Sequence, residues 1–449
     1  MSPLGDLPPD QIRPWMQRIA AWVADYRATV DQQRITPDVA IDDITAALPE
    51  LAPEHGEKLS AIFEDIERSI VPGLVHVGHP KFLGDAAASS STPGILGDWL
   101  AIALGAPAAA SPVTAAVEAT VLRWIRTALG MADSFDGIVQ DSAAAATLRA
   151  LAAARDAVYP EARRRGLAGA PKLMIYTSAE APDSVEHAAV ALGLGSDSVR
   201  RLETDGELRL RPAALRAAVA RDVHARLRPL AVVATVGTPS CGAVDPVPAI
   251  ADVCAEHQLW LHVDASRGGG LAFLPEGRCV LDGVGRADTV VVSSNIWLPV
   301  PVAFTVLYTR RAELLGERPE RRALAALGVW MTMRALGRAE LEARLREHLR
   351  LARRFAEWVD ADPDFELMAP ITMPVVCFRA GPPGVSDADE LNRRLVAQLT
   401  SAGRLYLTET RVGARVAMRI AVVNALTTES HLTDAWTVIH DAFDRTLVD

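Results

Sequence analysis

The stretch ADTVVVSSNIWLPVPVAFTVLYTR (287–310) decides the fold. A valine-rich run ends at Ser293, Ser294 and Asn295, and a second apolar run closes at Arg310. Such runs are typical of strands buried on both faces, and ligand sites form where parallel strands end. The polar residues therefore predict a site, although the next residue, Ile296, has a side chain without any polar atom.

The preceding two hundred residues alternate strands with helices. The strand-like segments KLMIYTS (172–178), LAVVATVGT (230–238) and LWLHVDAS (259–266) are separated by helical patterns near 184–193, 212–226 and 247–258. This order indicates βαβ units and a mainly parallel sheet covered on both faces, hence an α/β fold. The segments TVGTPSCG, HVDASRGGG and SSNIW should converge on one cleft.

The two ends of the chain differ from this middle part. Residues 8–30 place an apolar stripe on one helical face, which must pack on the body of the chain or on a partner subunit. After about residue 320, two long helical patterns precede further strand-like runs, which indicates a small α+β domain. The predicted organisation is a helical segment over 1–75, a large α/β domain over 76–318 and a small domain over 319–449.

The composition argues against several classes of function. The 449 residues carry a formal net charge of −10, which argues against a nucleic-acid binder. No apolar run reaches the roughly 18 residues of a membrane span, and the N-terminus does not resemble a secretory signal. The 4 cysteines lack CxxC spacing, and no His/Cys/Glu cluster has metal spacing. We expect a cytoplasmic protein with no metal, no membrane contact and no nucleic-acid partner.

Several segments carry a family resemblance in collinear order. They are IVPGLVHVGHPKFLG (70–84), GIVQDSAAAATLRALAAAR (137–155), YTSAEAPDSVEHAA (176–189), TVGTPSCGAVDPV (235–247), the opening stretch, and RVAMRIAVVNALTTE (415–429). Together they resemble the group II pyridoxal-phosphate (PLP) decarboxylases, the aromatic-L-amino-acid decarboxylase family of fold type I. The resemblance implies a PLP-fold large domain, a small C-terminal domain and a homodimer with its site at the subunit interface. Segment 1–75 would then serve dimerisation.

The resemblance breaks at the residues that handle the cofactor. The family's His-Lys-Trp triplet, whose lysine forms a Schiff base with PLP, corresponds to Asn295, Ile296 and Trp297. The family's ring-stacking histidine corresponds to Pro182. Only Lys58, Lys81 and Lys172 supply side-chain amines, and none is near in sequence.

Two further departures concern the phosphate and the catalytic loop. Asp141 and Ala144 replace Gly-like and Ser-like residues at the helix that would bind the phosphate, and a carboxylate there would repel a dianion. The family's long loop with its proton-donating tyrosine is reduced to RAELLGERPER (311–321). From these four departures the sequence predicts that PLP is not bound.

Other site residues are kept or newly gained. Asp264 matches the acid that pairs with the pyridine nitrogen in the family, while Ser266 and Arg267 replace an Ala-Tyr pair. Arg267 could clamp a carboxylate or phosphate, or it could simply pair with Asp264 or Asp141. The predicted catalytic residues are Asp264, Arg267, Asn295 and Ser294. The predicted lining residues are His79, Lys81, Asp141, Ser142, Pro182, Thr235, Thr238, Ser266, Ser293, Ile296 and Trp297.

Three functions remain open at this point. The first is a PLP-independent enzyme that uses the old cofactor cleft for acid-base or condensation chemistry on a small molecule. The second is a catalytically inactive homologue that binds or scaffolds. The third is an atypical PLP-dependent amino-acid decarboxylase. Because the scaffold motifs read as intact while four cofactor-linked features changed together, the sequence favours the first.

Overall fold

The computed structural model describes residues 6–84, 90–105, 111–294, 296–316 and 324–448. The chain divides into two compact units. The larger unit comprises Gly84–Arg393 and Thr408–Ala425, and the smaller comprises Met1–Leu83, Arg394–Leu407 and Leu426–Asp449. The domain limits predicted at residues 75 and 318 stay a prediction.

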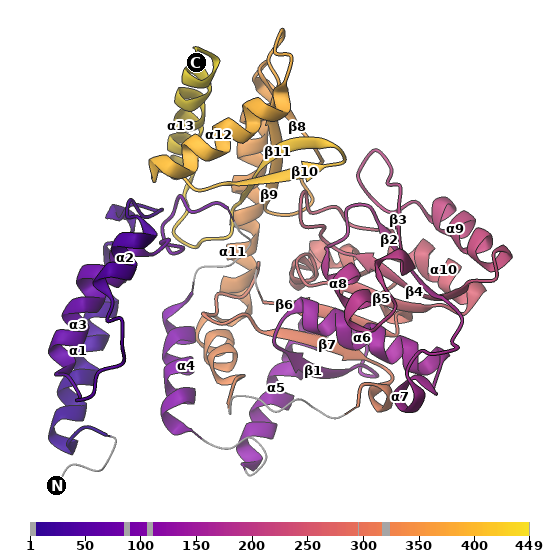
Figure 1. Cartoon of the computed structure of the whole chain (residues 1–449), viewed down its shortest axis with the longest axis horizontal. Helices are drawn as coiled ribbons and strands as arrows, with labels where there is room; N and C mark the ends of the chain where they lie inside the picture. Colours follow the sequence, from indigo (N-terminus) through magenta and orange to yellow (C-terminus); the bar gives the residue numbers. More distant parts are fainter. Residues whose placement is uncertain (1–5, 85–89, 106–110, 295, 317–323, 449) are drawn as a thin grey trace. The chain divides into compact units, whose positions relative to one another are not determined.

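The larger unit is built on a 7-stranded sheet with the order β1-β7-β6-β5-β4-β2-β3 (Figure 1). Strands β3, β2, β4, β5 and β6 pair in parallel, and β7 pairs antiparallel with both β6 and β1. This confirms the mainly parallel α/β fold. The strands are β1 (Asp136–Gln140), β2 (Leu173–Ser178), β3 (Val199–Leu202), β4 (Arg228–Thr235), β5 (Trp260–Ala265), β6 (Thr289–Ser293) and β7 (Thr305–Thr309).

Helices cover both faces of this sheet because its strands are apolar on both sides. One face carries α6 (Ala143–Val158) and α8 (Ser184–Ala191), whose buried alanines allow close packing on the strands. The other face carries α5 (Pro112–Ala128), α9 (Pro212–His224) and α10 (Val247–His257). Alternate residues of each strand therefore point toward α6 or away from it.

A second, 4-stranded sheet belongs to the same unit and has the order β10-β11-β9-β8. Its strands are β8 (Phe365–Leu367), β9 (Val375–Ala380), β10 (Thr408–Val412) and β11 (Arg415–Ala421), and all pairs are antiparallel. The helix α11 (Leu327–Ala361) packs on this sheet and on α4 (Thr92–Leu104). Gly337 adopts a φ of 67° inside α11, so the helix kinks there.

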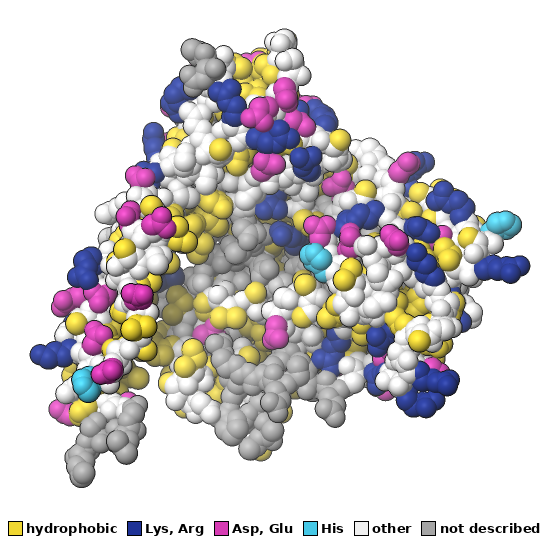
Figure 2. Space-filling model, in the orientation of Figure 1, with side chains coloured by type: hydrophobic (Ala, Val, Ile, Leu, Met, Phe, Trp, Pro, Cys, Tyr) yellow, Lys and Arg dark blue, Asp and Glu magenta, His cyan; other side chains and the backbone are white. Residues whose placement is uncertain are grey.

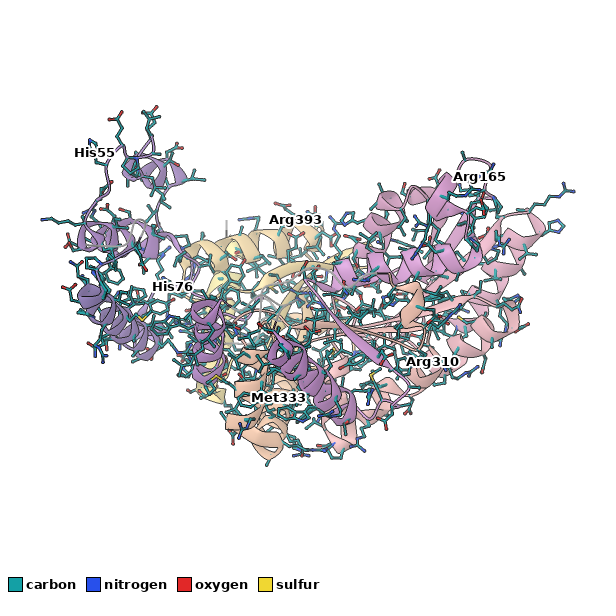
Figure 3. The ribbon with its side chains drawn as sticks, turned by 90° about the horizontal axis from the view of Figure 1, so that it is seen from below. His55, His76, Arg165, Arg310, Met333 and Arg393 are labelled. Carbon is teal, nitrogen blue, oxygen red and sulfur yellow. The ribbon has the colours of Figure 1, made fainter. Side chains whose placement is uncertain are left out.

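The smaller unit is helical, with α1 (Pro9–Ala28), α2 (Ile41–Ala47), α3 (Leu59–Asp65) and α13 (Glu429–Val448). Trp22 of α1 stacks on Tyr26, and the Tyr26 hydroxyl lies 2.7 Å from Nδ1 of His76, which is labelled in Figure 3. No residue of α1 is fully buried, so the predicted apolar stripe remains partly at the surface, and Figure 2 shows hydrophobic side chains there. Among the described helices none could cross a membrane.

Candidate functional site

Three predicted site residues lie on neighbouring strands at one edge of the large sheet. Thr235 of β4 and Asp264 of β5 are directly paired in register, and Ser293 is the last residue of β6. Residues two positions earlier on these strands, such as Val233 and Val291, pack with α6. Because side chains alternate along a strand, Thr235, Asp264 and Ser293 share the face that α6 covers. These strand ends therefore lie at one edge of the sheet, and their convergence on one cleft stays a prediction.

The pair Thr235 and Asp264 has unused hydrogen-bonding capacity. Asp264 is 3% exposed, and its Oδ1 accepts a hydrogen bond of 3.0 Å from the Ser266 N–H. The buried hydroxyl of Thr235 has no partner among the described residues. An unpaired buried hydroxyl costs about 1–3 kcal/mol, so a ligand that pairs with it would remove that cost.

Two buried side chains that were not among the predicted site residues lie next to this pair. Asp245, also fully buried, accepts hydrogen bonds from the N–H groups of Thr235 (2.8 Å) and Leu210 (2.7 Å). Burial raises the pKa of Asp245 to about 6, against the effect of these two bonds. The sequence held a signal for Asp245, because this residue lies in TVGTPSCGAVDPV (235–247), one of the segments that carry the family resemblance.

His262 is the second such residue, two positions before Asp264 and on the same face of β5. Its Nδ1 lies 3.0 Å from the Thr289 hydroxyl and its Nε2 lies 3.4 Å from the Thr147 hydroxyl. Burial lowers the pKa of His262 to about 4, although the Asp264 carboxylate opposes this shift. The imidazole is therefore neutral at pH 7 beneath the strand-end pair.

Arg267 follows β5 and is half-buried. Neither of the predicted structural pairings, with Asp264 or with Asp141, is formed, and no described residue makes a hydrogen bond or ion pair with its guanidinium. Asp141 is exposed beside Ser142, whose hydroxyl caps α6 by accepting a 3.1 Å hydrogen bond from the Ala145 N–H. Arg267 thus remains available to an anionic ligand.

The serines after β6 are used by the protein itself. The Ser293 hydroxyl accepts a hydrogen bond of 3.1 Å from the Thr305 hydroxyl. The Ser294 hydroxyl accepts one of 2.9 Å from the Phe304 N–H, and its carbonyl accepts from the N–H of Trp297 at 3.1 Å. These bonds fix the connection to β7, and a catalytic role for Ser294 stays a prediction. Asn295 lies outside the described residues.

Ile296 and Trp297 form an apolar wall at the same strand end, and each is 1% exposed. The Trp297 indole N–H donates to the Ser293 carbonyl at 3.0 Å, and the ring centroid lies 5.2 Å from that of Phe273. A Cβ at Gly270 would lie 2.0 Å from the Trp297 ring, so only glycine fits there. Ile296 packs in a cluster with Leu271, Met373, Val375, Ala421 and Val423.

Two more predicted lining residues shape turns of the larger unit. The Thr238 hydroxyl accepts a hydrogen bond of 3.0 Å from the Ala243 N–H in the turn after β4. Pro182 is half-buried, and its carbonyl accepts a hydrogen bond of 3.3 Å from the Val185 N–H at the start of α8. Their lining roles stay predictions.

His79 and Lys81 belong to the smaller unit. The His79 Nε2 lies 3.1 Å from the Asp31 carbonyl oxygen, and its Nδ1 accepts a hydrogen bond of 3.0 Å from the Lys81 N–H. Burial lowers the pKa of His79 to about 4. The contacts within this unit give His79 a structural role, and a role for either residue toward a substrate stays a prediction.

Comparison with known proteins gives consistent matches along the chain. Residues 42–319 and 319–381 match the pyridoxal-dependent decarboxylase conserved domain. Phenylacetaldehyde synthase from Arabidopsis thaliana is 30% identical over 473 residues, covering 96% of this chain and 96% of that protein. A tryptophan decarboxylase from Camptotheca acuminata is 30% identical over 481 residues, covering 98% and 96%. The crystal structure of Oryza sativa TDC with PLP and tryptamine matches with a TM-score of 0.92 and 31% identity, covering 99% of both chains.

These matches correct the prediction that PLP is not bound. The matched domain is pyridoxal-dependent, and the matched rice structure contains PLP. The prediction gave too much weight to single replaced residues and too little to the retained ones. The buried Asp264 carboxylate and the unpartnered Thr235 hydroxyl are polar groups that fit such a ligand. The fold, these strand-end residues and the matches show that the chain belongs to the pyridoxal-dependent decarboxylase family.

Proposed function

We propose that this chain binds PLP at the ends of β4, β5 and β6 and uses it on an amino acid. The observation that carries the proposal is the buried pair of Asp264 and Thr235, which has an acceptor and a hydroxyl to offer. Asp264 would accept a hydrogen bond from the ring nitrogen. The α6 N-terminus at Ser142 would hold the phosphate, and the exposed Asp141 carboxylate beside it would weaken that contact. The relatives named as a tryptophan decarboxylase and an aldehyde synthase support an aromatic amino acid as substrate.

Bound PLP supplies an aldehyde that condenses with a primary amine and a ring that withdraws electrons from the substrate. The chain's own residues bind and orient. Arg267 would hold the substrate carboxylate through charge-assisted hydrogen bonds, since the described residues provide no partner for its guanidinium. Ile296 and Trp297, both fully buried, exclude water from the wall beside them.

We also propose that the cofactor is held without a covalent bond to residue 296. Ile296 has no amine, and Lys172, which immediately precedes β2 in the larger unit, lies at the strand end opposite to Ser178. Cofactor affinity would then depend on noncovalent contacts alone, and we expect it to be weaker than in a covalently linked enzyme.

The test is a PLP titration of the purified protein, followed by borohydride reduction and peptide mapping. We expect saturable binding that leaves no reducible label on the 287–310 peptide. In the variant Ile296→Lys we expect about one label per chain on that peptide, because a buried, desolvated lysine amine is a good nucleophile. Absence of saturable binding by the unmodified protein would contradict the proposal, and a stable label on its Lys172 would contradict the noncovalent part.

A second candidate is a family member that binds ligands without turnover, which the lack of an amine at residue 296 favours. The two candidates differ in product formation. With PLP present, release of carbon dioxide from labelled aromatic amino acids supports the enzyme. Tight PLP binding without any product from such amino acids supports the binding protein.

We further propose a homodimer with the site at the subunit interface, in the cytoplasm. Each unit exposes large apolar side chains, namely Ile41 (77%) and Leu51 (81%) in the smaller and Ile102 (61%) and Leu104 (62%) in the larger. Light scattering should report twice the chain mass of 48.0 kDa. The variant Ile102→Asp should shift the measured mass toward that of one chain. The unpaired state of all the cysteines supports the compartment.

A further inference from the structure

The larger unit contains a cavity of about 510 Å³ that is lined by Asp245 but by none of the site residues predicted from the sequence. Its volume falls in the range of small-molecule pockets. The cavity, here called the hinge groove, lies between the turn at 243–248, the segment 271–282, helix α11 and the loop 369–372. Each of these segments belongs to the same compact unit.

The floor of the hinge groove is apolar. It is formed by the side chains of Val244, Leu271, Leu274, Val280, Leu349 and Ile371. Several of these side chains are only half-buried, so part of this apolar surface contacts solvent. Leu271 also belongs to the cluster around Ile296, so a single layer of side chains connects the groove with the apolar wall of the candidate site.

Both acidic and basic side chains line the groove, but most of the acids already have a partner within the protein. Glu207 pairs with Arg209 at 2.9 Å, and Glu276 pairs with Arg346 at 2.6 Å. The buried Asp245 accepts two backbone hydrogen bonds. The exposed Asp282 is the one lining acid for which the described residues provide no partner.

Positive charge gathers where α11 borders the groove. Arg353 lines both the groove and an adjoining cavity of about 480 Å³, which is also lined by Arg346, Arg350 and Arg354. Arg354 pairs with Glu357 at 2.8 Å and Arg350 with Glu347 at 2.8 Å. The Arg353 guanidinium forms no hydrogen bond or ion pair with the described residues, so it can bind an anion at the mouth of an apolar groove.

We propose that the hinge groove binds an amphipathic carboxylate, with the apolar body on Leu271, Val280 and Leu349 and the carboxylate on Arg353. Apart from Asp245, which holds the Thr235 backbone and also lines the groove, this site shares no residue with the proposed PLP cleft, and it does not depend on that cleft. Asp282, which has no partner among the described residues, would favour a cationic ligand instead. The test therefore compares an anionic probe with a cationic one.

The test uses decanoate, decylamine and acetate as probes in isothermal titration of the full chain. We expect saturable binding of decanoate and none of acetate, because the apolar body supplies much of the affinity. The variant Arg353→Gln should weaken decanoate binding by about tenfold or more, since a charge-assisted pair is lost. The matched control Arg354→Gln removes a neighbouring arginine that already has a partner, and it should change the affinity less than about twofold.

A second variant tests the floor. Val280→Asp places a carboxylate among the apolar side chains and should abolish decanoate binding. Because Val280 packs against the core, we expect a lower unfolding midpoint, while PLP binding stays as in the unmodified protein. Equal binding of decylamine and decanoate, or unchanged decanoate binding in Arg353→Gln or Val280→Asp, would overturn the proposal. Unchanged PLP binding in these variants separates its failure from that of the PLP cleft.

Discussion

The ends of β5 and β6 lie side by side in the sheet, yet they differ in chemistry. At the end of β5, Asp264 and Arg267, together with Thr235 at the end of β4, have polar atoms for which the described residues provide no partner. After β6, the hydroxyls of Ser293 and Ser294 are engaged, and Ile296 and Trp297 are fully packed. One end therefore keeps capacity for a ligand, whereas the other has become part of the core.

The residues that follow each strand explain the difference. The loop after β5 is rich in glycine and passes close to the turn after β4, because a Cβ at Gly268 would lie 2.6 Å from the Val236 carbonyl oxygen. Among the described residues the Asp264 side chain accepts one hydrogen bond, from the Ser266 N–H. After β6, large apolar side chains fill the space that Gly270 leaves. The comparison predicts that changes near β6 cost stability and that changes near β5 cost binding.

The largest expected effect is on the β6 side. Trp297→Ala removes a fully buried ring that packs on Phe273, so we expect a loss of about 3–5 kcal/mol in the free energy of unfolding. Urea unfolding monitored by circular dichroism measures it. Arg267→Gln is the matched change on the β5 side and should alter this free energy by less than about 0.5 kcal/mol. Similar losses in both variants would remove the contrast.

The next effect concerns His262, beneath the β5 end. Its pKa is about 4 in the folded chain and about 6.5 when unfolded, so the unfolded state binds more protons between these values. The contribution of a neutral His262 is complete above pH 6.5 and is lost as the pH falls toward 4, in total about 3 kcal/mol.

Urea unfolding between pH 7 and 4.5 checks this expectation. In His262→Gln the fall in stability with decreasing pH should be shallower, while His79 and His348, whose pKa values burial also lowers, contribute equally to both proteins. Equal slopes in the two proteins would show that His262 does not titrate as expected.

The fold could be read from the sequence because its signals are local. Val290–Val292 and the run around Val232 have the length and branching of buried strands, and the helices between them carry their own periodicity. The order of the strands, with β7 antiparallel between β1 and β6, could not be read in this way. Pairing across the sheet depends on contacts between residues far apart in sequence.

Part of the candidate site could be read from the sequence. Thr235 and Asp264 could be chosen as candidates because residues at the ends of buried strands meet at one edge, and their roles stay predictions. Asp245 and His262 were missed, since what distinguishes them is their burial and their partners. The prediction against PLP failed because it treated Ile296 and Pro182 as deciding for the whole cleft, whereas ligand binding depends on all of its contacts.

Asp264→Ala tests the β5 side directly. It removes the carboxylate that would accept a hydrogen bond from the PLP ring, and a bond to a charged group contributes about 1.5–3 kcal/mol. We therefore expect PLP binding weaker by about 10-fold to 100-fold in a fluorescence titration. Asp282→Asn, an exposed acid of the same unit, is the control and should leave the affinity unchanged. Unaltered PLP affinity in Asp264→Ala would place the cofactor elsewhere.

The smallest expected effect is that of Arg267→Gln on substrate binding. Arg267 is half-buried, so water partly screens its charge, and we expect an apparent affinity for an aromatic amino acid lower by about fivefold, with PLP affinity unchanged. The corresponding amine, which lacks the carboxylate, isolates the contact, because its binding should be equal in both proteins. A loss of the same size for the amine and the amino acid would show that Arg267 supports the loop after β5 instead of contacting the carboxylate. The two ligands thus separate a binding role of Arg267 from a structural one.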